Sequence, residues 1–148
     1  MILQLALGTV MMTLTLLAIG VGFWAIELWL ARSRDWLVRP PHRPRLLAAL
    51  GVLGAWVIAE MTVAVWAWAL LFLALGLFDH VEPAVYFALV VFTTLGFGDI
   101  ILGHDEWRLL SGLAAANGLL SFGVMTALLV EGVRGIRVDQ MAADEARR

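Results

Sequence analysis

The chain has 148 residues, of which 62% are hydrophobic and 15% are charged, and its formal net charge is −2. With a mean hydropathy of +0.92, it does not suit a water-soluble domain, and the composition predicts a protein that lives in a bilayer. The length allows only a few spans of about 20 residues, which excludes a large transporter built from internal repeats unless several chains assemble. The absence of cysteine excludes disulfides and cysteine metal sites.

The first apolar segment runs from about Ile2 to Leu30, and we expect residues 1–31 to form an N-terminal transmembrane helix. A secretory signal would carry a positive residue before its apolar stretch, and this segment has none there, so we expect it to be retained. Residues 32–45 then carry five arginines and three prolines, which favours an aqueous linker. The positive-inside rule places this linker in the cytoplasm and the N-terminus outside.

The second apolar segment, Leu46 to Phe78, is longer than the roughly 20 residues that cross a bilayer, so part of it must tilt or protrude. It contains Glu60, about 27 Å from Phe78 along an ideal helix, which places this carboxylate near the inner interface if the helix stands upright. A membrane carboxylate is a functional candidate by default. An interfacial or inter-helix-paired Glu60 is an equally open interpretation.

A short outer connection follows, and Pro83 suits the first turn of a helix. The apolar stretch from Pro83 to Thr93 is too short to cross the membrane and leads directly into a polar run with two glycines, Thr93 to Asp99. These features predict a re-entrant helix that enters from outside and turns back. A third span begins near Trp107 and continues through Val130, returning the chain to a cytoplasmic tail.

Irregular backbone survives at membrane depth only where it is buried in protein or lines a water-filled path. Gly96 and Gly98 can adopt positive φ, so a short segment in which they alternate with other residues can present a column of carbonyl oxygens. Such a column can replace the water around a permeating cation. One chain supplies one wall of this path, and a closed ring needs several copies.

Two motifs carry a family resemblance. Thr94 to Asp99, TLGFGD, is similar to the signature filter of the potassium channel family, with Leu95 and Phe97 in place of the usual valine and tyrosine. Residues 118–127, GLLSFGVMTA, resemble the inner helix of small prokaryotic members. The resemblance implies an all-α membrane protein with three transmembrane helices, a re-entrant pore helix and a selectivity filter, assembled as a homotetramer.

The family pattern also implies residue roles. K⁺ would bind the backbone carbonyls and the Thr94 hydroxyl, with no other cofactor or metal. The filter residues are Thr94, Leu95, Gly96, Phe97 and Gly98, and the filter is supported by Thr93, Asp99 and Tyr86, of which Asp99 would bond to the aromatic Tyr86. The cavity and gate would be formed by Gly118, Leu119, Phe122, Thr126 and Val130, with Gly118 at a hinge position. A glycine within a helix either permits close packing or provides a hinge, and both interpretations stay open.

The predicted cavity stripe consists of four residues at helical spacing, namely Leu119, Phe122, Thr126 and Val130. Ordinary helix packing predicts the same spacing, so packing stays open as an alternative to lining a pore. Four copies of Glu131 would form an acidic ring at the cytoplasmic mouth, either as a proton-sensitive gate or as a simple attractor of cations. The predicted outer face carries five acidic residues against one arginine, Arg108, and would concentrate cations at the mouth. The five are Asp79, Glu82, Asp99, Asp105 and Glu106.

The domain organisation we expect is residues 1–31 as the first helix, 32–45 as the linker, 46–136 as the pore domain and 137–148 as a short tail. No helix carries regularly spaced arginines, so we expect no voltage sensor, and no catalytic constellation suggests an enzyme. The sequence thus predicts a potassium-selective channel of the cell membrane, whose partners are its own copies and lipids, not nucleic acid or a soluble protein. The alternatives are a nonselective monovalent cation channel and a non-conducting scaffold or regulatory subunit.

Overall fold

The structure is a computed structural model that describes residues 1–103 and 107–146. Within these ranges the chain forms four helices and no strand. Three of the helices are long and apolar enough to cross a membrane. The helices are α1 (Ile2–Leu37), α2 (His42–Ala74), α3 (Val81–Phe92) and α4 (Arg108–Glu145). The described chain is therefore an all-helical membrane protein with three candidate spans, as its composition predicted.

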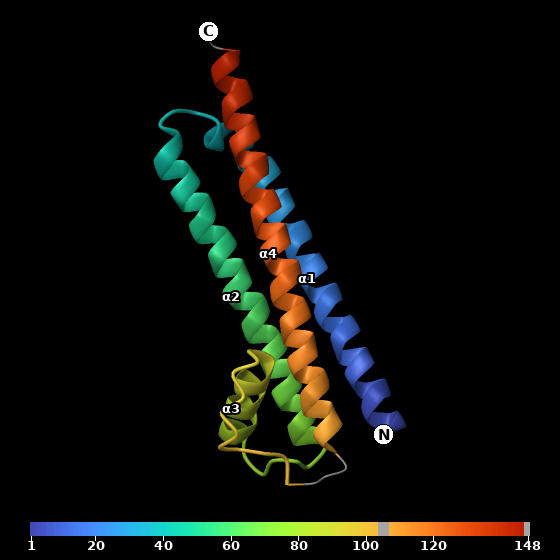
Figure 1. The fold of residues 1–148 in the computed structure, drawn as a ribbon. Coiled ribbons are helices and arrows are strands. Elements are labelled where there is room, and N and C mark those ends of the chain that lie inside the picture. The colour runs from blue at the N-terminus through green and yellow to red at the C-terminus, as the bar shows by residue number, and fades with distance from the viewer. Residues whose placement is uncertain (104–106, 147–148) are drawn as a thin grey trace.

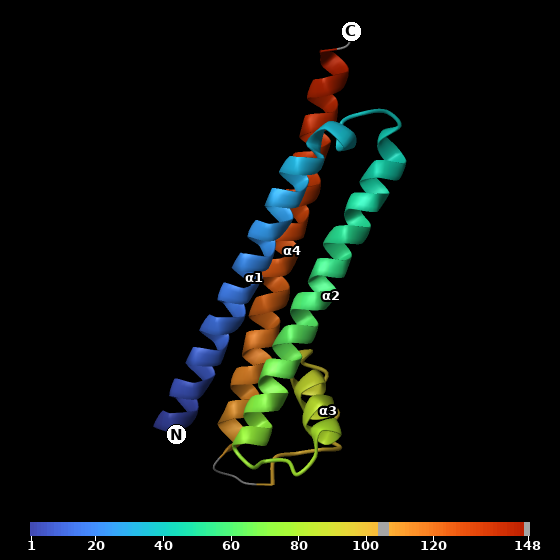
Figure 2. The ribbon, with the colours of Figure 1, turned by 180° about the vertical axis from the view of Figure 1, so that it is seen from behind.

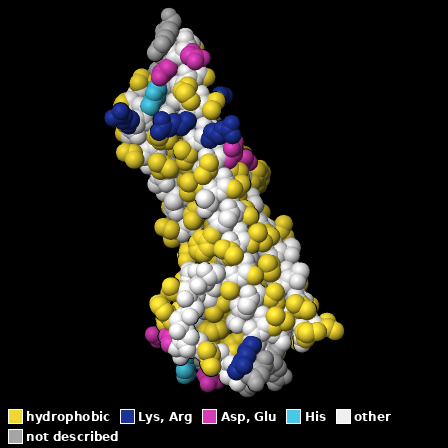
Figure 3. All heavy atoms as spheres, in the orientation of Figure 1, with side chains coloured by type: hydrophobic (Ala, Val, Ile, Leu, Met, Phe, Trp, Pro, Cys, Tyr) yellow, Lys and Arg dark blue, Asp and Glu magenta, His cyan; other side chains and the backbone are white. Residues whose placement is uncertain are grey.

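The three long helices α1, α2 and α4 form one elongated bundle, and the short α3 packs against α2 and α4 at one end (Figures 1 and 2). The N-terminus lies at the end that holds α3, whereas the C-terminus and the α1–α2 turn lie at the opposite end (Figure 1). On the face in Figure 3, charged side chains gather at the two ends and leave an apolar band between them. This distribution suits a bundle whose middle lies in hydrocarbon.

The helices extend further than the sequence indicated. α1 continues through Arg32 and Arg34 to Leu37, and α2 already begins at His42, so the predicted linker of residues 32–45 shortens to a turn over residues 38–41. Arginine is a good helix former, and a proline is tolerated in a first helical turn, where Pro44 lies. α4 likewise continues to Glu145, so most of the predicted tail is helical.

α2 ends earlier than predicted, at Ala74 instead of Phe78. Gly76 has φ +68°, its N–H donates to the Leu73 carbonyl at 2.9 Å, and the Leu77 N–H donates to the Phe72 carbonyl at 3.0 Å. These two bonds form a Schellman motif, which satisfies carbonyls at the helix end and turns the chain. The turn directs the chain toward α3.

Aromatic packing fixes α3 in place. Phe72 of α2 is fully buried, and its ring centroid lies 5.3 Å from that of Phe87 of α3. Phe78 packs on the same ring of Phe87 at 5.3 Å. Lipid tails are as apolar as these side chains, so close packing of this kind holds the helices together instead of a hydrophobic driving force. The end of α3 is thereby held at a defined position on the bundle.

Candidate functional site

The polar run, Thr93 to Asp99, directly follows the C-terminal end of α3. The N–H groups of Leu95 and Gly96 both approach the carbonyl of Val90, at 3.0 and 3.2 Å, and the Thr94 N–H donates to the Val91 carbonyl at 2.9 Å. The carbonyls of Val90 and Val91 near the end of α3 are therefore satisfied by the run itself. The partial negative charge at this helix end lies beside the start of the run, where it favours a cation.

Residues with positive φ alternate along the run with residues that do not have it. Thr94, Gly96 and Gly98 have φ values of +59°, +57° and +75°, whereas Leu95 and Phe97 between them do not have positive φ. The two glycines adopt the conformation that the sequence predicted for them, but positive φ at Thr94 was not expected. A residue with a Cβ rarely adopts this conformation, so the surrounding chain must hold Thr94 in it. From here the chain returns to the end of the bundle at which α3 began (Figure 2).

Within a single chain the run is open. Residues 94 to 99 are all exposed, and the large side chains of Leu95 and Phe97 retain 57% and 65% of their accessible surface. The predicted cavity stripe is similar, because Leu119 and Val130 are 68% and 58% exposed and Thr126 is also exposed. Exposed apolar surfaces of this kind mark interaction sites.

Phe122 differs from the rest of the stripe. It is half-buried, and its ring centroid lies 6.2 Å from that of Phe92, the last residue of α3. Phe122 therefore packs beneath the helix that carries the run, and part of its surface stays available to the same face as Leu119.

Tyr86 and Asp99 join α3 to the end of the run. The Tyr86 hydroxyl donates to Oδ2 of Asp99 at 2.6 Å, the contact that the family resemblance implied. This hydrogen bond lowers the pKa of the Asp99 carboxyl below its ordinary value and raises the pKa of the Tyr86 hydroxyl. Thr93, the other predicted support residue, instead donates to the Leu89 carbonyl within its own helix at 2.7 Å.

The shifted pKa values predict how this support responds to pH. Because the folded-state pKa of Asp99 is lowered, the stability it contributes is present above the ordinary aspartate pKa of about 3.9 and is lost only as pH falls below that range. We therefore expect the thermal unfolding temperature to show no step from this pair between neutral and mildly acidic pH. Replacing Tyr86→Phe should lower the unfolding temperature at neutral pH, with a smaller difference from the wild type in strong acid.

Gly118, at the predicted hinge position, is a site of close packing in this structure. A Cβ at Gly118 would overlap the carbonyl oxygen of Phe92 and would lie 2.7 Å from its carbonyl carbon. The backbone of α4 therefore approaches the C-terminal end of α3 so closely that only glycine fits. Gly123, the second glycine of the motif, has nothing within 4 Å of its Cβ position. Gly118 is therefore a point at which α4 contacts the end of α3, the helix that precedes the polar run.

A buried polar row beside this point was not identified from the sequence. Nδ2 of Asn117 donates to the Thr15 hydroxyl of α1 at 3.0 Å, and the Ser121 hydroxyl lies 3.4 Å from Oδ1 of Asn117. Asn117 and Ser121 are fully buried, and Thr15 is 7% exposed. The signal was an asparagine within an apolar span, since polar side chains there bond across helices. α1 is thus attached to α4 at the level of Gly118.

Thr15→Val should destabilise the bundle by about 1 kcal/mol, because Asn117 would lose its acceptor in an apolar interior. Thr13→Val is a matched control. Both hydroxyls donate to the carbonyl four residues earlier at 2.8 Å, but Thr13 is exposed and makes no cross-helix hydrogen bond within the described part of the chain. Unfolding titrations in mixed micelles measure the difference, and equal effects of the two substitutions would show that the cross-helix bond contributes nothing.

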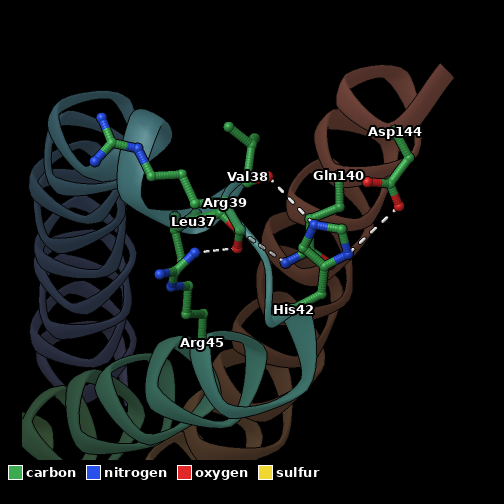
Figure 4. A network of polar contacts seen from close by, with 7 residues as sticks. All are labelled: Leu37, Val38, Arg39, His42, Arg45, Gln140 and Asp144. Carbon is green, nitrogen blue, oxygen red and sulfur yellow. Dashed lines mark hydrogen bonds and ion pairs between the residues drawn. The ribbon is translucent and has the colours of Figure 1, made fainter. Parts of the chain in front are cut away.

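At the other end of the bundle, α4 is tied to the α1–α2 turn (Figure 4). Nε2 of Gln140 donates to the Leu37 carbonyl at 3.0 Å. One turn away, Arg34 of α1 makes a bidentate pair with Asp139, with N···O distances of 2.8 and 3.0 Å. These contacts hold the extension of α4 beyond Val130 against α1 and the turn.

His42, the first residue of α2, completes this attachment (Figure 4). Its Nε2 lies 3.2 Å from the Val38 carbonyl, and its Nδ1 lies 3.5 Å from the Asp144 carboxylate of α4. Both neighbours are acceptors, so the ring serves both only when each nitrogen carries a proton. α1 therefore contacts α4 both near Gly118 and at its far end, and α2 contacts it at the far end.

The predicted charged sites are distributed unequally. Glu131 is exposed, and its Oε2 lies 3.8 Å from the Arg134 guanidinium of the same chain, which partly compensates the acidic ring that we predicted. Asp79 and Glu82 are exposed at the α3 end of the bundle, which is the end that we predicted to lie outside. Asp105 and Glu106 lie outside the described residues.

The fold and this site together define a class of protein. Three long apolar helices suit a multi-pass membrane protein. The short helix α3 and the loop that returns from it, in which positive φ alternates along the backbone, form a re-entrant segment.

A family model described as ion channel matches residues 57–134, just over half of the chain. The chain therefore belongs to this ion channel family. The match begins within α2 and ends within α4, and it includes α3 and the polar run, whereas α1 lies outside it. Comparisons with curated proteins and with solved structures gave no match.

Proposed function

We propose that this channel is selective for potassium and conducts it passively through a ring of four copies of the run Thr94–Gly98. The observation that carries the proposal is the positive φ at Thr94, Gly96 and Gly98, alternating with the residues between them in a TLGFGD sequence. This alternation lets successive carbonyl oxygens point to one side and take the place of the ion's water. The negative end of α3 adds a favourable field at the inner end of the column.

Assembly follows from what one chain leaves uncovered. One run supplies one wall of a path, and Leu95, Phe97 and Leu119 expose apolar surface beside it that further copies would cover. In the tetramer, Leu119, Phe122, Thr126 and Val130 would line the cavity, with the Glu131 ring at its inner mouth. The protein would lie in the cell membrane with the N-terminus and the run outside, and with the arginine-rich turn in the cytoplasm.

The experiment that tests this function is ion flux from liposomes that contain the purified protein. We expect an outward potassium gradient to drive flux, and an equal sodium gradient to drive at least about tenfold less, if the carbonyl column discriminates as in known filters. Equal fluxes of the two ions would replace the proposal by a nonselective cation channel. No flux of either ion over a range of pH values would favour the non-conducting scaffold.

A further inference from the structure

One carboxylate lies at membrane depth and is not explained by ion conduction. Glu60 is the only charged residue between Arg45 and Asp79. With the helix ends that the structure gives, it lies about 22 Å from Arg45 and about 21 Å from Ala74, near the midpoint of α2. This differs from the sequence-based estimate, which counted from Phe78 and placed Glu60 near the inner interface. A hydrocarbon core of about 30 Å therefore surrounds it.

Glu60 has little compensation from the protein. Nε1 of Trp56, one turn earlier, donates to its Oε1 at 3.2 Å, and this is the hydrogen bond that the described residues offer it. Segments 2–26, 46–78 and 109–130 contain no basic residue. A second copy of the chain therefore has no cation to bring to this depth either. A carboxylate in hydrocarbon is costly without a counter-charge, so Glu60 is stabilised there either by taking up a proton or by a cation from outside the protein.

The surroundings hold Glu60 in a defined position. A side chain at Gly22 of α1 would overlap Oε1 of Glu60 and would place its Cβ 3.0 Å from Cδ, so the carboxylate of Glu60 lies directly against α1 at this glycine. The Trp56 indole packs on Phe23, with ring centroids 5.9 Å apart, and it is 9% exposed. The Trp56–Glu60 pair is therefore built into the contact between α1 and α2.

Glu60 lines a cavity of about 220 Å³ between these two helices. The walls are apolar, with Met11, Leu14 and Ala18 from α1 and Val63 and Ala67 from α2. Thr15 is the other polar residue of the lining, but its hydroxyl already donates to the Met11 carbonyl and accepts from Asn117. An apolar cavity of about 150 Å³ is large enough for benzene, so this one can take a short alkyl chain or a ring.

We propose that this cavity binds a membrane-dissolved organic ammonium ion, with its apolar part between α1 and α2 and its charged nitrogen at Glu60. With one carboxylate and otherwise mostly apolar walls, the cavity offers Ca²⁺ or Mg²⁺ few of the six or more oxygen ligands that these ions take. An anion would be repelled. An amphiphilic amine supplies both the missing counter-charge and the apolar surface that fills the cavity.

The test is equilibrium binding of radiolabelled decylamine, at neutral pH, to the protein in nanodiscs of neutral phosphatidylcholine, with empty nanodiscs subtracted. We expect one saturable site per chain. Glu60→Gln should weaken it by at least about tenfold, as the loss of one member of a desolvated charge pair does. Glu27→Gln is the matched control, because Glu27 is the other carboxylate of the helix pair α1–α2 within an apolar stretch and lies away from the cavity. It should leave the affinity unchanged.

A second variant tests whether the ligand occupies the cavity, and a second ligand tests whether its charge is needed. Ala67→Phe fills the cavity and should abolish the site while Glu60 stays in place. Radiolabelled decanol, which has the same chain without the charge, should bind the wild type and Glu60→Gln equally and weakly. Equal decylamine affinity of the wild type and Glu60→Gln, or equal affinity of the wild type for decylamine and decanol, would overturn the proposal. Circular dichroism and elution profiles of each variant establish that it is folded.

Discussion

Replacing Gly118→Ala is expected to abolish most ion flux and to lower the free energy of unfolding by about 2 to 3 kcal/mol, because the added methyl group overlaps the Phe92 carbonyl. The obstacle is backbone, which cannot move aside as a flexible side chain can. α3 would have to shift away from α4, and it carries the run of residues 94–99 with it. Flux in liposomes and unfolding in mixed micelles measure the two effects.

Gly135→Ala is the matched control for this substitution. Gly135 lies in the same helix, but it has nothing within 4 Å of its Cβ position and lies beyond the predicted cavity. The exchange should leave flux unchanged and stabilise the helix by up to about 1 kcal/mol, the propensity difference between glycine and alanine. If Gly118→Ala behaved like Gly135→Ala, the close approach of α4 to Phe92 would not be a feature of the protein, and a hinge would again be the better interpretation.

The local features of the fold were the ones that the sequence could predict. Composition indicated a membrane protein, the long apolar stretches indicated three spans, and the short apolar stretch before the glycines indicated a helix that turns back. Residue type permits positive φ at Gly96 and Gly98, and the structure has it at both. Each of these depends on neighbours in the chain, which the sequence displays directly.

What the sequence could not predict depends on contacts between distant segments. A glycine in a helix is equally compatible with a hinge and with a close approach, and only the position of Phe92 decides for Gly118. The bond between Thr15 and Asn117 joins residues that are 102 positions apart. Helix ends were missed for a related reason, because the pairing of Arg34 with Asp139 helps to keep α1 helical through the arginines that indicated an aqueous linker.

These distant contacts give α1 a clear structural role. It is bonded to α4 beside Gly118 through Asn117, and again at the far end through Asp139. A displacement of α4 relative to α1 would break a buried hydrogen bond in an apolar interior as well as an exposed ion pair. α1 therefore restrains the helix that would line the cavity, although it lies outside the segment that matches the channel family.

Gly96→Ala is expected to reduce potassium flux by roughly a hundredfold or more while leaving the helices folded. Nothing lies within 4 Å of the Cβ position at Gly96, so the effect is conformational, since φ is +57° there. A residue with a Cβ loses about 1 to 2 kcal/mol in this conformation, and a ring of four copies would lose roughly four times as much. The carbonyl column would then be populated only rarely. Flux and circular dichroism of the same preparation measure the two expectations.

Gly103→Ala separates strain in the run from any general effect of a methyl group in this loop. Among the residues that the structure describes, Gly103 has no neighbour within 4 Å of its Cβ position, and it does not have positive φ, so alanine should be accepted there with little change in flux. If Gly96→Ala conducted potassium as well as Gly103→Ala does, conduction would not depend on the alternating backbone. The positive φ at Thr94, Gly96 and Gly98 would then no longer support the proposed potassium selectivity. Membership of the ion channel family would be unaffected.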